Sequence, residues 1–248
     1  MTGWVKAPVD PGVEKPPVDP ESAALTASLA ALIRTGLDNS ERSQQISIGA
    51  SEAGFGCARR LSYKLAGTAP VNFPDPMKLL VGIGVHLALA DIFGRLGSRW
   101  LVEHPVSYAD IPGTLDLYDQ ANYDLIDWKT TTKSRLAVYR KDGPPAHYLA
   151  QIRLYAAALV QAGYKVKRTA IVFLPVDGTL DDMWAYLSTP DGAGALAVAE
   201  RLHDLADSDP ADIAATPDRY CGWCGSYRPG STDLDVACPG SATKGKPS

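Results

Sequence analysis

Two short apolar segments separated by a few turn-forming residues constrain the fold of this chain more than any other feature. They cover residues 113–119 and 123–130, and the turn formers between them include Gln120, Ala121 and Asn122. Apolar runs that alternate with polar residues on both sides of a turn predict the two strands of a β-hairpin. The hairpin therefore decides which of its polar side chains meet.

Side-chain alternation predicts where the acidic groups of this hairpin lie. Successive side chains of a strand face opposite sides, so Asp116 faces away from Leu115 and Leu117. An even-length loop places Asp116 on the face of Asp127 and Lys129, and a four-residue loop places it directly across from Asp127. An odd-length loop without a bulge would separate them, and this alternative stays open.

Two carboxylates at opposed positions need a compensating charge. Directly opposed side chains have Cβ atoms roughly 4.5–5.5 Å apart, and like charges at that spacing destabilise the sheet. Mg²⁺ or Mn²⁺ offsets the repulsion and keeps coordination positions open for a phosphate. This is the chemistry of a metal-dependent phosphodiesterase. The alternative is a solvated hairpin face with ordinary acids and a lysine.

Four short motifs occur in a characteristic order along the chain. They are Gly-x-x-x-His at 82–86, Gly-x-x-Asp at 113–116, Asp-x-Lys at 127–129 and Gln-x-x-x-Tyr at 151–155. With these motifs the sequence resembles the RecB-like branch of the P-D-(D/E)-x-K nuclease superfamily, including the CRISPR-associated RecB-like exonucleases. The resemblance spans about residues 55–240.

The resemblance implies a role for each motif residue. The implied metal ligands are His86, Asp116, Asp127 and the backbone carbonyl of Trp128. The implied catalytic residues are Asp116, Asp127 and Lys129, with Gln151 and Tyr155 on the substrate side near the lysine. His86 could instead be a core histidine bonded to a carbonyl, and the Gln151 helix could present a plain polar edge. Glu103 is as consistent with a solvent-facing strand position and is left out of the predicted site.

The four cysteines form a second constellation. Cys57 stands alone, whereas Cys221, Cys224 and Cys238 lie near the end of the sequence, and the first two of these form a Cys-x-x-Cys knuckle. One branch of the RecB-like family is similar, with one cysteine before the core and three after it that together hold a 4Fe-4S cluster. Thirteen residues separate Cys224 from Cys238, a wider gap than is usual in that branch.

Other uses of the four thiols stay open. A single Zn²⁺ held by four thiolates is the strongest alternative, because spacing does not separate zinc from an iron–sulfur cluster. Unrelated buried thiols are a further alternative. Two disulfides are disfavoured, because no secretory signal precedes the chain and a DNA-cutting enzyme belongs in a reducing cytosol.

Length and charge restrict the class of protein. A chain of 248 residues with 46% hydrophobic content forms one core, and the longest uncharged apolar run, residues 79–90, is too short to span a bilayer. We therefore expect no membrane association. A net charge of −4 gives no global attraction to nucleic acid, so DNA contacts must be local. Candidate basic groups are Arg59, Arg60, Lys64, Lys133, Arg135, Arg140 and Lys141. A second set, Lys165, Lys167 and Arg168, could be only a solvated turn, and ordinary surface charge is the alternative for all of them.

The pattern predicts an α/β fold: a central mixed β-sheet flanked by helices, as in the restriction-endonuclease-like core, with the N- and C-terminal segments joined by the four-cysteine cluster. Residues 1–20 are a flexible Pro-rich arm and residues 21–248 a single nuclease domain. A polar loop at 47–56 leads into the Cys57 helix. Helices are expected at 22–36, 75–97, 146–163 and 192–206, and strands at 100–108, 113–119, 123–130, 168–175 and 183–188.

The function that follows is a Mg²⁺- or Mn²⁺-dependent exonuclease that trims single-stranded DNA ends, with a structural 4Fe-4S cluster. We expect it in the cytosol of a bacterium or a phage-infected host, in DNA repair or recombination, beside a helicase or recombination partner. One alternative is a noncatalytic DNA-binding subunit of a recombination or replication complex. Another is a zinc-stabilised interaction domain.

Overall fold

The computed structural model describes residues 19–38 and 48–240, and the chain divides into two compact units between Gln44 and Gln45. Helix α1 (Pro20–Asp38) belongs to the first unit. It begins at a proline, two residues before the predicted start at residue 22, and the carboxylate of Asp19 caps it by accepting a hydrogen bond from the Ser22 amide. Residues 1–18 of the predicted arm lie outside the described residues.

The second unit is built on a five-stranded sheet with the strand order β1-β2-β3-β4-β5. All neighbouring strands are antiparallel except β3 and β4, which are parallel because two helices connect them. The sheet is therefore mixed, as predicted. The strands are β1 (Trp100–Tyr108), β2 (Ile111–Asp119), β3 (Asp124–Thr131), β4 (Arg168–Pro175) and β5 (Trp184–Ser188).

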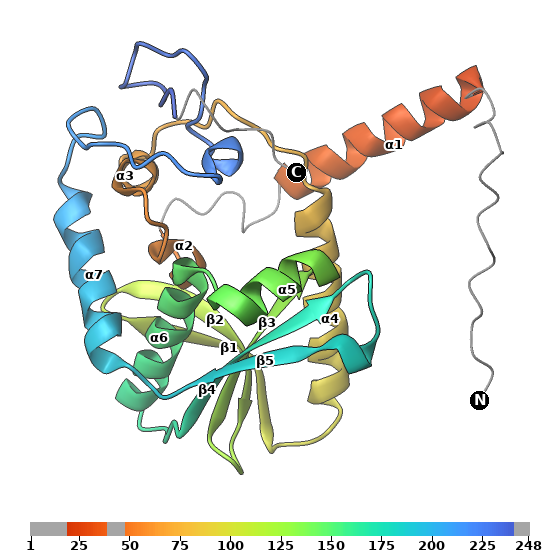
Figure 1. Ribbon diagram of the computed structural model, residues 1–248, viewed down its shortest axis with the longest axis vertical. Coiled ribbons are helices and arrows are strands. Elements are labelled where there is room, and N and C mark those ends of the chain that lie inside the picture. The colour runs from red at the N-terminus through yellow and green to blue at the C-terminus, as the bar shows by residue number, and fades with distance from the viewer. Residues whose placement is uncertain (1–18, 39–47, 241–248) are drawn as a thin grey trace. The chain divides into compact units, whose positions relative to one another are not determined.

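Helices cover both faces of this sheet (Figure 1). Helix α4 (Met77–Gly94) lies on one face, and α6 (Ala146–Gln161) covers the other, with α7 (Gly192–Ala206) packed beside α6. The α6 side carries the larger apolar cluster, which includes Leu125 and Phe173. The fold is thus the expected α/β arrangement of a central sheet between helices.

Helix α4 is apolar but packs on the sheet. Its 18 residues have a mean hydropathy of 1.6, which by length and composition alone would suffice to cross a membrane. Its Leu89 and Phe93 side chains pack against Trp128 of β3. In the sequence, the uncharged run between Lys78 and Asp91 is shorter than this helix, so the sequence predicted no segment long enough to span a bilayer. Such helices also occur in proteins that never enter a bilayer, so the observation is weak evidence for a membrane span.

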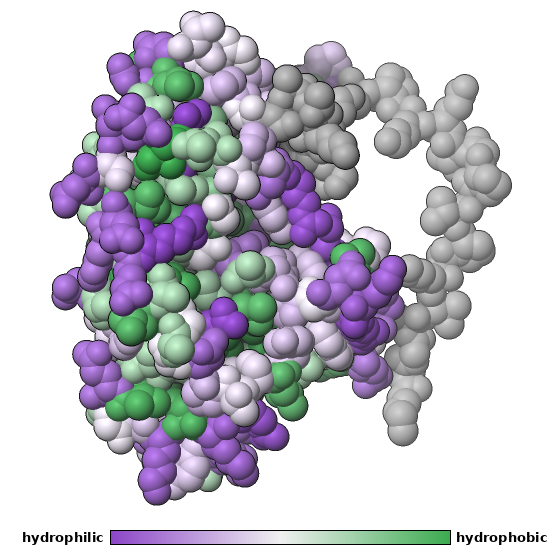
Figure 2. Space-filling view, turned by 60° about the vertical axis from the view of Figure 1, so that its left-hand side comes forward, coloured by the Kyte–Doolittle hydropathy of each residue, from purple (hydrophilic) through white to green (hydrophobic). Residues whose placement is uncertain are grey.

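Several short helices complete the second unit. The sequence predicted neither α2 (Ala50–Ala53), inside the expected loop, nor α5 (Lys133–Asp142). Helix α5 begins because the Thr132 hydroxyl accepts a hydrogen bond from the Arg135 amide. In the sequence, its basic residues predict DNA contacts and not a helix. Hydrophobic and hydrophilic residues are interspersed on the face shown in Figure 2. The remaining elements are α3 (Ala58–Leu65), η1 (Leu180–Asp182) and η2 (Cys221–Trp223).

Candidate active site

The β2–β3 hairpin has a four-residue loop, the even length on which the sequence prediction depends. Asp119 pairs with Asp124, and the paired ladder ends at Leu117 and Ile126. The buried Asp119 carboxylate accepts hydrogen bonds from the Arg99 guanidinium and from the Ala121 amide at the turn. These bonds hold the pKa of Asp119 well below its usual range, despite burial. The turn is thereby fixed.

The predicted alternation along β2 breaks at Asp116. Leu117 packs in the cluster on the α4 side, whereas Leu115 packs in the cluster on the α6 side, so these two leucines do not share a face. Across β1, the ladder is interrupted at Glu103, whose φ of 44° lies in the left-handed region. The prediction assumed a regular strand and was wrong here. Asp116 lies where β2 stops pairing with β3.

Asp116 is 7% exposed and joins two elements. One carboxylate oxygen accepts a hydrogen bond of 2.7 Å from the backbone amide of Trp128, and the other lies 3.2 Å from Nδ1 of His86 on α4. The bond to Asp116 raises the pKa of His86 against the opposing effect of burial. His86 therefore has an acidic partner rather than a carbonyl. A metal-ligand role of the Trp128 carbonyl remains a prediction.

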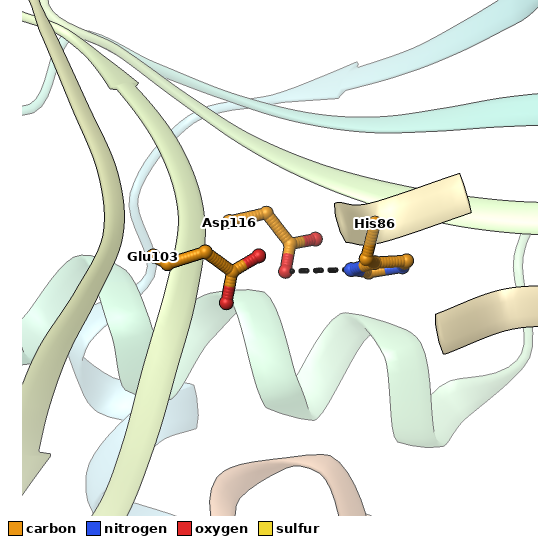
Figure 3. Close-up of side chains that lie close together, drawn as sticks. All are labelled: His86, Glu103 and Asp116. Atoms are coloured by element: carbon orange, nitrogen blue, oxygen red, sulfur yellow. Dashed lines mark ion pairs between the residues drawn. The ribbon is translucent and has the colours of Figure 1, made fainter. Parts of the chain in front are cut away.

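Glu103 completes a group that could hold a metal ion. One ligand atom each of His86, Glu103 and Asp116 lies within 4.8 Å of the others, and Figure 3 shows the three side chains converging. Glu103 and Asp116 are cross-strand neighbours, because the pairs on either side of them belong to one register. The sequence placed Glu103 on the strand before the hairpin but could not decide which way it points.

Asp127 lies at the centre of β3 and is fully buried. Among the described residues neither of its oxygens accepts a hydrogen bond of normal geometry, although Oδ2 lies 2.7 Å from Nζ of Lys129. Burial raises the pKa of Asp127 to about 6, opposed by Lys129 and reinforced by Asp116. A fully buried carboxylate is costly even beside one ammonium group, and a metal cation would compensate the remaining cost.

Gln151 and Tyr155 lie on the inner face of α6, and both are buried. The Gln151 amide lies 3.1 Å from the Tyr155 hydroxyl. A Cβ at Gly113 would lie 2.5 Å from the Tyr155 ring, so glycine is needed there for close approach rather than for an unusual φ. Two of the sequence motifs thus contact each other.

Gly113→Ala should destabilise the protein by about 1–3 kcal/mol, because the added methyl group overpacks against Tyr155. Urea unfolding measures this loss. Gly84→Ala is the matched control, since a Cβ there meets no atom within 4 Å and alanine favours a helix by up to about 1 kcal/mol. Equal stability of Gly113→Ala and the natural protein would contradict the close contact.

The raised pKa of Asp127 predicts a pH-dependent difference between the metal-free protein and Asp127→Asn. The folded pKa of about 6 exceeds the ordinary value of 3.8, so the protonated acid favours the folded state and ionisation as the pH rises toward 6 removes stability. Asp127→Asn should therefore be the more stable protein at pH 7–8, by about 1–3 kcal/mol, with the difference vanishing near pH 4. Thermal unfolding in a chelator measures it, and a difference independent of pH would contradict the assignment.

All four cysteines line one pocket, and none of them forms a disulfide among the described residues. Cys57 precedes α3, and Cys221 begins η2. Asn72, ahead of α4, donates hydrogen bonds of 3.0 Å to the carbonyls of Gly222 and Cys224, which ties the knuckle to the chain that follows Cys57. Burial raises the pKa of the Cys224 thiol, and Arg60 opposes this. The structure brings the two ends of the second unit together at the thiols.

Four thiols around one pocket match the ligand count of a tetrahedral zinc ion and that of a 4Fe-4S cluster.

Comparisons with known proteins found similar solved structures of low sequence identity, and these do not establish the function of this chain. No protein-family model matches the sequence, and no curated protein matches it significantly. The solved structure of SSO0001 is 17% identical, with 81% of this chain and 93% of that chain covered and a TM-score of 0.47. A phage-related exonuclease from Haemophilus somnus 129PT is 14% identical, with coverages of 60% and 77% and a TM-score of 0.42. LHK-Exo in complex with dAMP is 12% identical, with coverages of 64% and 86% and a TM-score of 0.44.

Proposed function

We propose that this chain is a Mg²⁺- or Mn²⁺-dependent deoxyribonuclease of the RecB-like type that degrades single-stranded DNA from an end. The observation that carries the proposal is the buried Asp127, whose oxygens accept no normal hydrogen bond among the described residues, beside Lys129 on the same strand. Such a carboxylate fits a cation better than it fits a structural ion pair alone.

The residues divide the chemistry between them. His86, Glu103, Asp116 and Asp127 would hold the ion, which when bound supplies a nucleophilic water at neutral pH and neutralises phosphate charge. Lys129, whose ammonium faces Asp127, orients that water and stabilises the charge growing on the phosphoryl oxygens. Gln151 and Tyr155 position the DNA strand and the lysine. Retention of two carboxylates with the lysine argues against a noncatalytic DNA-binding subunit.

We infer in addition that Cys57, Cys221, Cys224 and Cys238 hold a 4Fe-4S cluster. The shared pocket supports it, as does the resemblance to the family branch with one cysteine before the core and three after it. When bound, the cluster would cross-link residues far apart in the sequence. Its role is structural, because it would hold Cys57 and the C-terminal segment together at the shared pocket.

Digestion of linear and circular single-stranded DNA tests the nuclease proposal. With Mn²⁺, linear DNA should disappear and circular DNA should persist, since an exonuclease needs an end, and a chelator should stop the reaction. Asp116→Asn should be inactive. Asp181→Asn, an exposed acid in η1, should keep full activity. Cleavage of both substrates would replace the exonuclease with an endonuclease, and cleavage by Asp116→Asn would remove the proposed site.

A further inference from the structure

An aromatic cluster connects the catalytic lysine with the cysteine pocket. Nζ of Lys129 lies 5.1 Å from the Tyr148 ring centroid, and Tyr148 contacts His147 with ring centroids 4.4 Å apart. His147 in turn contacts Phe55 at 4.8 Å and Tyr220 at 5.4 Å. Phe55 and Tyr220 line the cysteine pocket. The rings therefore form a continuous half-buried surface beside the active site.

Three arginines surround this cluster without a carboxylate partner among the described residues. The Arg60 guanidinium lies 3.7 Å from the Phe55 ring centroid, and that of Arg219 lies 5.1 Å from the Tyr220 ring and bonds the Tyr220 hydroxyl. Arg135 is half-buried on α5, one helical turn before Tyr139, whose ring contacts Phe173 beside Tyr148. Elsewhere Arg95 and Arg153 pair with aspartates. The nearby Asp218 carboxylate accepts a bond from the Tyr220 amide, not from Arg219.

The local field of the cluster is positive although the chain as a whole is acidic. His147 is kept neutral, because burial together with the charges of Lys129, Arg60 and Arg219 lowers its pKa to about 4. His147 and Tyr148 also form the first turn of α6, a 16-residue helix without a side-chain cap. The positive end of its dipole adds to the field. An anion would be stabilised here.

We propose that Arg135 and Arg219 bind a neighbouring phosphate of the single-stranded DNA whose scissile phosphate lies at the metal site, with Tyr148 and Tyr220 as the adjoining stacking surface. This rests on the proposed function. Unpaired guanidinium groups bind phosphate strongly, and aromatic rings accept any base. Arg60 is assigned to the thiols instead, because it lines their pocket. The strand thus runs from Lys129 across the start of α6 toward Arg219.

Kinetics and binding of a 20-nucleotide oligothymidylate test this path, with the double variant Arg135→Gln/Arg219→Gln. We expect KM to rise about tenfold with kcat within about twofold, because the arginines act on binding and not on the reacting atoms. The slope of log Kd against log salt should become shallower by about 0.7, since each single-strand phosphate contact contributes about 0.7 and the proposal removes one. Arg95→Gln/Arg153→Gln, which removes an exposed and a half-buried arginine that both pair with aspartates, is the control and should change neither KM nor the salt slope.

The outcomes separate this path from the nuclease proposal. Unchanged KM and salt slope in an active double variant would overturn the phosphate site and leave the nuclease intact. Arginine-dependent binding by a natural protein that never cleaves with Mn²⁺ would support the phosphate site and overturn the nuclease. Absence of both binding and cleavage in the natural protein would overturn both. Thermal unfolding of each variant confirms that it is folded.

Discussion

Lys129→Ala should lower the rate of metal-dependent DNA cleavage about 10²–10³-fold, the loss typical when one charge-stabilising group is removed from an active site. Lys129 is held close to the reacting region by its position 2.7 Å from Asp127 and by the Tyr148 ring. The variant should still bind Mn²⁺, because no metal ligand has been removed. Single-turnover digestion of end-labelled DNA and a Mn²⁺ titration measure the two effects separately.

Lys165→Ala is the matched control for this loss. Lys165 is exposed and lies over the Tyr123 ring, so it also contacts an aromatic face but lies outside the proposed site. It should retain the full rate. A Lys129→Ala protein that cleaves at the natural rate would exclude the lysine from the chemistry. Loss of Mn²⁺ binding in that variant would instead show that Lys129 supports the ion.

Cys221→Ser should remove the bound iron and destabilise the protein on the order of 5 kcal/mol, because metal-site binding energy is folding energy. For a chain of this size the thermal midpoint should fall by about 10–20 °C. Cys57→Ser should produce the same loss, since both thiols line one pocket although they lie at opposite ends of the second unit. Anaerobic purification, iron and sulfide analysis, and thermal unfolding measure it.

Val236→Ser controls for a polar substitution in the same C-terminal segment, because Val236 is exposed and lines no part of the pocket. It should keep both iron content and thermal midpoint. One zinc per chain without iron would replace the cluster with a mononuclear site. Unchanged stability and metal content in Cys221→Ser would remove any structural role of the thiols.

The sequence predicted the strands of the sheet and its main helices because each carries a clear apolar period or a turn signal. The four-residue length of the β2–β3 loop could not be predicted, because the polar residues between the two apolar runs fit an odd-length loop as well. Alternation failed at Asp116, because it assumes a regular strand and the backbone at Glu103 enters the left-handed region. No single-sequence pattern marks such an interruption. For the same reason the orientation of Glu103 could not be predicted.

The surroundings of the site depend on contacts between distant segments. Tyr220 reaches His147 only because the C-terminal segment folds back over the start of α6. The sequence contains no local signal for that approach. Gly113 illustrates the opposite case: its motif was visible, but the reason for a glycine emerged only from the Tyr155 ring beside it.

The most direct test of a metal centre at these carboxylates is X-ray diffraction at the manganese absorption edge from crystals soaked in MnCl₂. We predict an anomalous peak bordered by His86, Glu103, Asp116 and Asp127, and no peak in crystals of Asp127→Asn soaked in the same way. A peak elsewhere, or no peak in crystals of a protein that cleaves DNA with Mn²⁺, would contradict the account.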